Sequence, residues 1–216
     1  MLSLKQNRML KLLDGQILEC KNCSMFNGGR CKPYYTGRYN GIAIIGEAPG
    51  GEEVNNIPFC GKAGKKLWSI MNPIGFKREE FFIMNTINCR PTDGKRNLKP
   101  NNDSIKNCRE WIRKYLKVIK PEIIITLGNY AMGTILSRNS GIIKLNATVT
   151  NSAEFGCDVL RCVHPSMCVY NTEGERMLEK SINILKKLKN GKEKNKEKKN
   201  DIRKNDPLFW VQTSFI

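Results

Sequence analysis

Two groups of residues in this 216-residue sequence have the types and spacing that can do chemistry. The first is the stretch 46–64, GEAPGGEEVNNIPFCGKAG, which is rich in glycine, carries acidic side chains and directly follows the apolar run 41–45. A buried strand that opens into such a loop is a common way to build an active site. The pattern therefore predicts a ligand-binding or catalytic loop here.

The second group is a set of four cysteines. Cys20 and Cys23 form a CxxC pair, Cys89 follows a predicted strand, and Cys108 lies in the next predicted helix. Four thiolates from two distant segments suit either a structural zinc ion or a [4Fe–4S] cluster. The sequence holds nine cysteines in total, an odd number that does not pair completely. Spacing alone leaves the metal undecided.

Alternating strands and helices must position these groups. Apolar runs predict strands at 41–45, 81–86, 123–127 and 158–163. Helical spacing of apolar residues predicts helices at 2–13, 62–71, 103–118, 130–137 and 172–189. Asp103 or Ser104 is expected to cap the third helix, and 142–156 to form a hairpin or a loop. This order indicates an open, mostly parallel α/β sheet that binds ligands beyond the carboxyl ends of its strands.

Composition limits the class of protein. The hydrophobic fraction of 40% supports a packed core, and no apolar run is long enough to span a membrane. The N-terminus has interspersed charges and does not read as a signal peptide, so we expect an intracellular protein in the cytoplasm or nucleoid. The net charge of +17 predicts attraction to a polyanion, of which nucleic acid is the usual one. A lysine-rich protein with a solvated tail is the alternative explanation of the charge.

Taken together and in order, the motifs resemble the iron–sulfur uracil-DNA glycosylases called family 4, from about residue 20 to about residue 188. The matching pieces are CxxC at 20–23, GEAPG at 46–50, PFxGxAG at 58–64, Asn85 with CRP at 89–91, Cys108, PEIIITLG at 121–128 and HPS at 164–166. The resemblance implies a three-layer α/β/α sandwich around a small, mostly parallel sheet. It also implies that Cys20, Cys23, Cys89 and Cys108 hold a structural [4Fe–4S] cluster, with zinc as the alternative occupant.

The resemblance also assigns roles at the predicted site. It implies a monofunctional enzyme that hydrolyses the N-glycosidic bond of uracil in DNA and leaves an abasic site for base excision repair. Glu47 would stabilise the positive charge on the sugar and orient water, and His164 would stabilise the leaving base. Asn85 would read the edge of the flipped base while Phe59 stacks on its face. Glu53 would occupy the place where the family crowds out a thymine methyl group.

The chain departs from the family pattern in three loops. The loop between GEAPG and PFCG is shorter, the segment 92–103 is longer, and MCVYN after HPS lacks the leucine and arginine that often follow. Met167 or Tyr170 would then wedge into the duplex. A glycosylase of the same fold acting on a modified pyrimidine, such as a modified cytosine, is one alternative. A non-catalytic DNA-binding accessory module is the other.

The sequence predicts two parts. Residues 1–190 would form the glycosylase-like domain with its cluster, and 191–216 a basic tail that ends in the apolar sequence DPLFWVQTSFI. The lysine-rich run would bind phosphates, whereas the apolar end would dock on its own domain or on a protein partner. We expect a monomer whose partner is DNA, single- or double-stranded.

Overall fold

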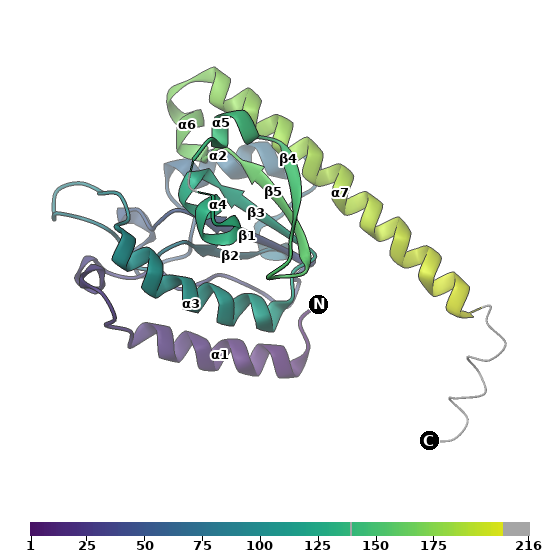
Figure 1. Ribbon diagram of the computed structural model, residues 1–216, viewed down its shortest axis with the longest axis horizontal. Helices are drawn as coiled ribbons and strands as arrows, with labels where there is room; N and C mark the ends of the chain where they lie inside the picture. The colour runs from purple at the N-terminus through teal and green to yellow at the C-terminus, as the bar shows by residue number, and fades with distance from the viewer. Residues whose placement is uncertain (139, 205–216) are drawn as a thin grey trace.

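A five-stranded sheet lies at the centre of the fold in the computed structural model, which describes residues 1–138 and 140–204 (Figure 1). Its strands are β1 (Ile42–Gly46), β2 (Phe82–Asn85), β3 (Ile123–Leu127), β4 (Thr148–Ser152) and β5 (Cys157–Cys162). They lie in the order β2-β1-β3-β5-β4, and of these only β4, at one edge, runs antiparallel to its neighbour. The predicted, mostly parallel sheet is confirmed.

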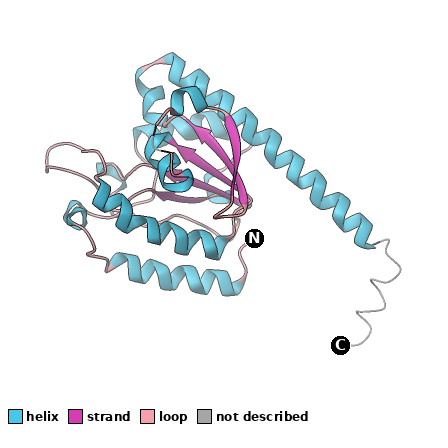
Figure 2. Ribbon diagram, in the orientation of Figure 1, coloured by secondary structure: helices cyan, strands magenta, loops and turns pink. Residues whose placement is uncertain are grey.

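Helices cover both faces of the sheet (Figure 2). Successive residues of β1 face opposite sides, so Ala43 and Ile45 belong to one core cluster while Ile42 and Ile44 belong to the other. The first cluster packs against α1 (Leu4–Leu18), α3 (Asn102–Ile119) and α4 (Gly128–Leu136). The second packs against α2 (Lys62–Met71), α6 (Pro165–Tyr170) and α7 (Thr172–Lys204). Because both faces are covered, the strands read as continuous apolar runs, and the three-layer α/β/α sandwich is confirmed.

The topology brings several strand ends to one edge. β1, β2, β3 and β5 are parallel, so their carboxyl ends point the same way. The chain passes from β1 to β2 on one side and later to β3 on the other, which makes the end of β1 the point where the strand order reverses. Ligands of open α/β sheets bind at such a point.

Several boundaries differ from those that the sequence predicts. The cap of α3 is Asn101, whose side chain accepts a hydrogen bond from Ser104 N, so the prediction of Asp103 or Ser104 was wrong. The ambiguous stretch forms the short helix α5 (Ile142–Leu145) and then β4, which makes a hairpin with β5. The short helix α6 was not predicted. Short 3-10 helices cover Ser24–Gly28, Gly51–Glu53, Asn72–Ile74 and Arg78–Glu80.

The last helix is longer than expected. α7 continues past residue 189 to Lys204 and extends away from the body of the protein (Figure 1). Lysine and glutamate are good helix formers, and pairs such as Lys189 with Glu193, 3.9 Å apart, add to helix stability. The apolar end, 205–216, lies outside the described residues. Within the part of the chain that the structure describes, no helix is both long and apolar enough to cross a membrane.

Candidate active site

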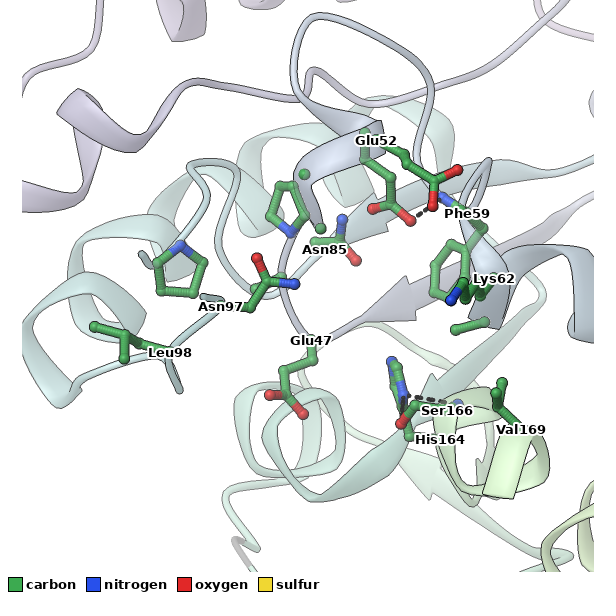
Figure 3. A pocket seen from close by; sticks show the side chains of 18 of the residues that line it. Glu47, Glu52, Phe59, Lys62, Asn85, Asn97, Leu98, His164, Ser166 and Val169 are labelled. Atoms are coloured by element: carbon green, nitrogen blue, oxygen red, sulfur yellow. Dashed lines mark hydrogen bonds between the residues drawn. The ribbon is translucent and has the colours of Figure 1, made fainter. Parts of the chain in front are cut away.

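A pocket of about 330 Å³ opens at the carboxyl edge of the sheet (Figure 3). The loop after β1, the end of β2, the loop that follows it and the segment after β5 all contribute to its lining. The structure thus brings together the five site residues that the sequence singled out: Glu47, Glu53, Phe59, Asn85 and His164. They come from segments far apart in the chain, and parallel strand ends are what unite them.

Asn85 forms part of the pocket wall at the end of β2. It is only 3% exposed, and its side-chain amide has no hydrogen-bond partner among the described residues. Gly46, beside it in β1, makes room for this amide: a Cβ atom at position 46 would lie 2.3 Å from Asn85 Oδ1 and 2.5 Å from Phe59 Cζ. The amide is therefore free to hydrogen-bond a ligand in the pocket.

Phe59 is held in an unusual backbone conformation. Its φ of +60° is in the left-handed region, which costs a non-glycine residue roughly 1–3 kcal/mol. Three side chains fix it there. Its N–H donates to Glu53 Oε1 at 3.0 Å, and its carbonyl accepts from Trp68 Nε1 at 3.3 Å and from the guanidinium of Arg78. The ring is thereby placed on the pocket wall, 3% exposed.

His164 enters the pocket as a neutral hydrogen-bond donor. Its Nδ1 accepts from Ser166 N–H at 3.2 Å and lies 2.7 Å from Ser166 Oγ, so the ring proton is assigned to Nε2. Burial lowers the pKa of His164 to about 4, which keeps the ring uncharged at neutral pH. The ring centroid of Phe59 lies 6.3 Å from that of His164.

Glu47 is the carboxylate directly after β1. In the view of Figure 3 it lies beside His164, with Asn85 above them. Burial raises the pKa of Glu47, and the positive charge of Lys99 opposes the shift. Its side chain forms no hydrogen bond or ion pair with the residues that the structure describes. It is a half-buried carboxylate without a structural partner, which argues against a capping role.

Comparison with known proteins identifies the family. The sequence profile of the Uracil DNA glycosylase superfamily matches residues 34–189. The chain belongs to this superfamily. It is 29% identical to the type-4 uracil-DNA glycosylase of Saccharolobus solfataricus, over 82% of this chain and 85% of that protein. Identity to the type-4 uracil-DNA glycosylase of Archaeoglobus fulgidus is 27%, over 73% of this chain and 82% of the relative.

The four cysteines that the sequence singled out, Cys20, Cys23, Cys89 and Cys108, lie near one another. Burial raises the pKa of Cys108 to about 12, and negative charge on Cys23, Cys89 or Cys20 would raise it further. Arg30 joins the two cysteine segments: its Nε donates to Cys89 Sγ at 3.4 Å and its Nη2 to the Cys20 carbonyl at 2.5 Å. Among the described residues, no three His, Cys, Asp or Glu side chains are placed to hold one metal ion.

Sequence reasoning missed several residues of this glycosylase-family site. Arg78 and Trp68 fix the Phe59 carbonyl, yet nothing in their sequence context signals that role. Leu98 lines the rim, and the length of its loop was the only signal. Of the two wedge candidates, Tyr170 lines the pocket and is 85% exposed, whereas Met167 packs against a core cluster.

Proposed function

We propose that this chain is a monofunctional DNA glycosylase that hydrolyses the N-glycosidic bond of uracil in DNA and leaves an abasic site. The observation that supports this most is the meeting of Glu47, Asn85 and His164 from three strand ends in one pocket. The type-4 uracil-DNA glycosylases to which the chain is similar carry the same activity in their names. The substrate is therefore DNA that contains uracil.

Recognition would use Asn85 and Phe59. A base turned out of the stack presents an edge of hydrogen-bonding groups and a flat face. The free amide of Asn85 offers both a donor and an acceptor for that edge, and the ring of Phe59 offers a stacking surface. Glu53 holds the Phe59 N–H, so its first task is to position the stacking ring. The same side chain also lines the pocket, where it would crowd out a thymine methyl group, as the resemblance to the family implies.

Bond cleavage would use Glu47 and His164. Breaking the bond builds positive charge on the sugar and negative charge on the leaving base. The Glu47 carboxylate would stabilise the sugar cation and orient a water molecule for attack. The neutral His164 would donate its Nε2–H to a carbonyl oxygen of the base as negative charge develops there. Removing a donor of this kind typically lowers kcat by about 10² to 10³.

The experiment is incubation with oligonucleotides that carry uracil, thymine or modified cytosines, followed by alkali. We expect strand breaks at uracil, and loss of activity in Glu47→Gln. The matched control is Glu179→Gln, which removes the same charge from an exposed position of α7 that does not line the pocket. Strand breaks only at a modified cytosine would show that this base, and not uracil, is the substrate. A folded, iron-loaded protein that breaks no strand would refute the proposal.

We further propose that Cys20, Cys23, Cys89 and Cys108 hold a structural [4Fe–4S] cluster. Four cysteine thiolates are the usual ligand set of such a cluster, and Cys20, Cys23 and Cys89 all lie close enough to Cys108 to act on its pKa. Asn88, next to Cys89, is 2% exposed, and its amide N and O have no partner among the described residues. Such a cluster would fix the two cysteine segments to each other.

Purified protein tests this directly. We expect a brown sample with broad absorption near ~400 nm and about four irons per chain, as four cysteine ligands imply. Cys108→Ser should lose the colour, whereas Cys60→Ser, a change of another thiol outside the set, should keep it. A colourless protein that contains zinc and excises uracil would contradict the cluster assignment.

A further inference from the structure

A second cavity, of about 560 Å³, lies between α3 and α4. On α3 it is lined by residues spaced at i, i+3, i+4 and i+7, from Asn102 to Arg109, which form one face of a helix. The first turn of α3 borders it, so the positive dipole end of that helix contributes to its potential, whereas α4 lines it from its first turn to its C-cap, Ser137. No acidic residue is among its lining residues.

The cations of this cavity are incompletely neutralised. Lys99 and Lys106 are exposed and form no ion pair with any described residue. Arg109 donates to Glu154 at 3.3 Å, but Arg113 shares that carboxylate, and Arg109 Nε is buried without a partner in the described part of the chain. Three positive charges thus line one cavity, and Arg109 shares its carboxylate partner, Glu154, with Arg113.

Buried polar groups of the cavity also lack partners. Thr134, on the α4 side, is 4% exposed, and its hydroxyl has no hydrogen-bond partner among the described residues. A buried hydroxyl or guanidinium N–H without a partner in a native structure calls for a bound ion or water. Unpaired donors together with unneutralised cations suit an anion that can accept several hydrogen bonds.

The cavity adjoins the candidate active site. Burial and the charge of Glu47 raise the pKa of Tyr130, which lines the cavity, so the two residues are near each other. The positive charge of Lys99, which lines the cavity, in turn lowers the pKa of Glu47. Leu98 lines the pocket of the candidate active site and the next residue, Lys99, lines the second cavity, so the two cavities are neighbours.

We propose that the cavity between α3 and α4 binds a backbone phosphate of the DNA strand, close to the nucleotide whose base enters the pocket. Lys106 and Arg109 supply the charge, and Thr134 together with the first turn of α3 supplies hydrogen-bond donors. The proposal rests on the proposed function for its DNA ligand. It adds where the strand runs: from the pocket, past Glu47, into the groove between these two helices.

The test measures binding of single-stranded DNA against salt concentration. Each phosphate contact contributes about 0.7 to the slope of log K on log salt for a single strand. We expect Lys106→Ala to weaken binding and to lower this slope by about 0.7. Lys117→Ala is the matched control, because it removes another exposed lysine from the last turn of the same helix, away from the cavity. Its slope should equal that of the wild type.

A second measurement locates the phosphate. The oligonucleotide carries a 2′-fluoro-deoxyuridine, whose fluorine slows cleavage, and one uncharged methylphosphonate linkage that is moved along the strand. Wild type should lose affinity when a particular linkage near the uridine is neutral, and Lys106→Ala should lose nothing further at that linkage. Equal losses in both proteins at every linkage would overturn the proposal.

Two further outcomes distinguish a DNA phosphate from free inorganic phosphate, and this proposal from the proposed glycosylase function. Inorganic phosphate that competes with DNA for the wild type but not for Lys106→Ala supports a phosphate site. Inorganic phosphate could also bind the cavity while the salt slope of DNA binding by Lys106→Ala stays at the wild-type value. The cavity would then bind free phosphate only, and the proposal fails. The salt slope needs no uracil excision, so it is readable even if the protein proves inactive on uracil.

Discussion

Gly46→Ala should separate the geometry of the pocket from the presence of its chemical groups. The added Cβ would lie 2.3 Å from Asn85 Oδ1, 2.5 Å from Phe59 Cζ and 2.9 Å from Phe59 Cε2. Ordinary carbon contacts begin near 3.5 Å. The amide and the ring must therefore each move by about 1 Å to reach that distance. The variant keeps every proposed catalytic side chain and changes only the positions of Asn85 and Phe59.

The expected loss follows from that displacement. A misplacement of about 1 Å at a reacting centre can cost about 10²-fold in rate. Overpacking a tight site also costs about 1–3 kcal/mol of stability, so the melting temperature should fall while the protein still folds. We expect single-turnover excision to slow by about 10².

The assay is single-turnover excision from a uracil oligonucleotide, with thermal unfolding measured on the same samples. Gly50→Ala is the control, because it places the same methyl group in the same loop with its nearest neighbour, Asn97 Nδ2, 3.8 Å away. It should excise uracil at close to the wild-type rate. If Gly46→Ala is folded and as fast as the wild type, the pocket is not positioned as described.

Three further predictions concern pH, the rim and the last helix. The pKa of Glu47 is raised, so excision should fall as pH falls through that raised value, before His164, with its pKa of about 4, takes up a proton. The folded protein holds the proton of Glu47 more tightly than the unfolded chain does, so the ionised form of Glu47 destabilises the fold above that pKa. Glu47→Gln should therefore raise the melting temperature at pH 7. The gain should vanish near pH 4, where the carboxyl group is protonated in both states. Tyr170→Ala should slow excision from double-stranded DNA more than from single-stranded DNA, because only the duplex needs a wedge, and equal slowing on both would exclude that role. Deleting 191–216 should weaken DNA binding and flatten its salt dependence without changing kcat, whereas unfolding of the truncated chain would show that this segment supports the core.

The sequence predicted the sheet and the edge at which its ligand binds, because strands buried on both faces are continuous apolar runs. The apolar runs of β1 and β3, and the spacing in α2, identified the elements to within a residue or two. The position of Glu47 after β1 and of His164 after β5 then follows from parallel strands ending at one edge. Local pattern and tertiary packing agree in this part of the chain, so local reasoning was sufficient.

Long-range contacts were what the sequence did not reveal. The left-handed backbone of Phe59 depends on Arg78 and Trp68, which reach its carbonyl from other segments. No local rule assigns a left-handed conformation to phenylalanine, which favours extended structure. The cavity between α3 and α4 was likewise hidden, because its lining residues are spread over two helices and a loop that only the fold brings together.

Several unfavourable features of this protein lie at the two cavities described above. The first cavity holds the strained backbone of Phe59, whose ring also belongs to a core cluster, together with an amide without a partner and a half-buried carboxylate. The second holds unneutralised cations and the unpaired hydroxyl of Thr134. Unpaired polar groups cost stability in the free protein, and a bound nucleotide would give the Asn85 amide a partner through its base and the Thr134 hydroxyl a partner through its phosphate. We therefore expect one DNA strand to cross both cavities when it binds.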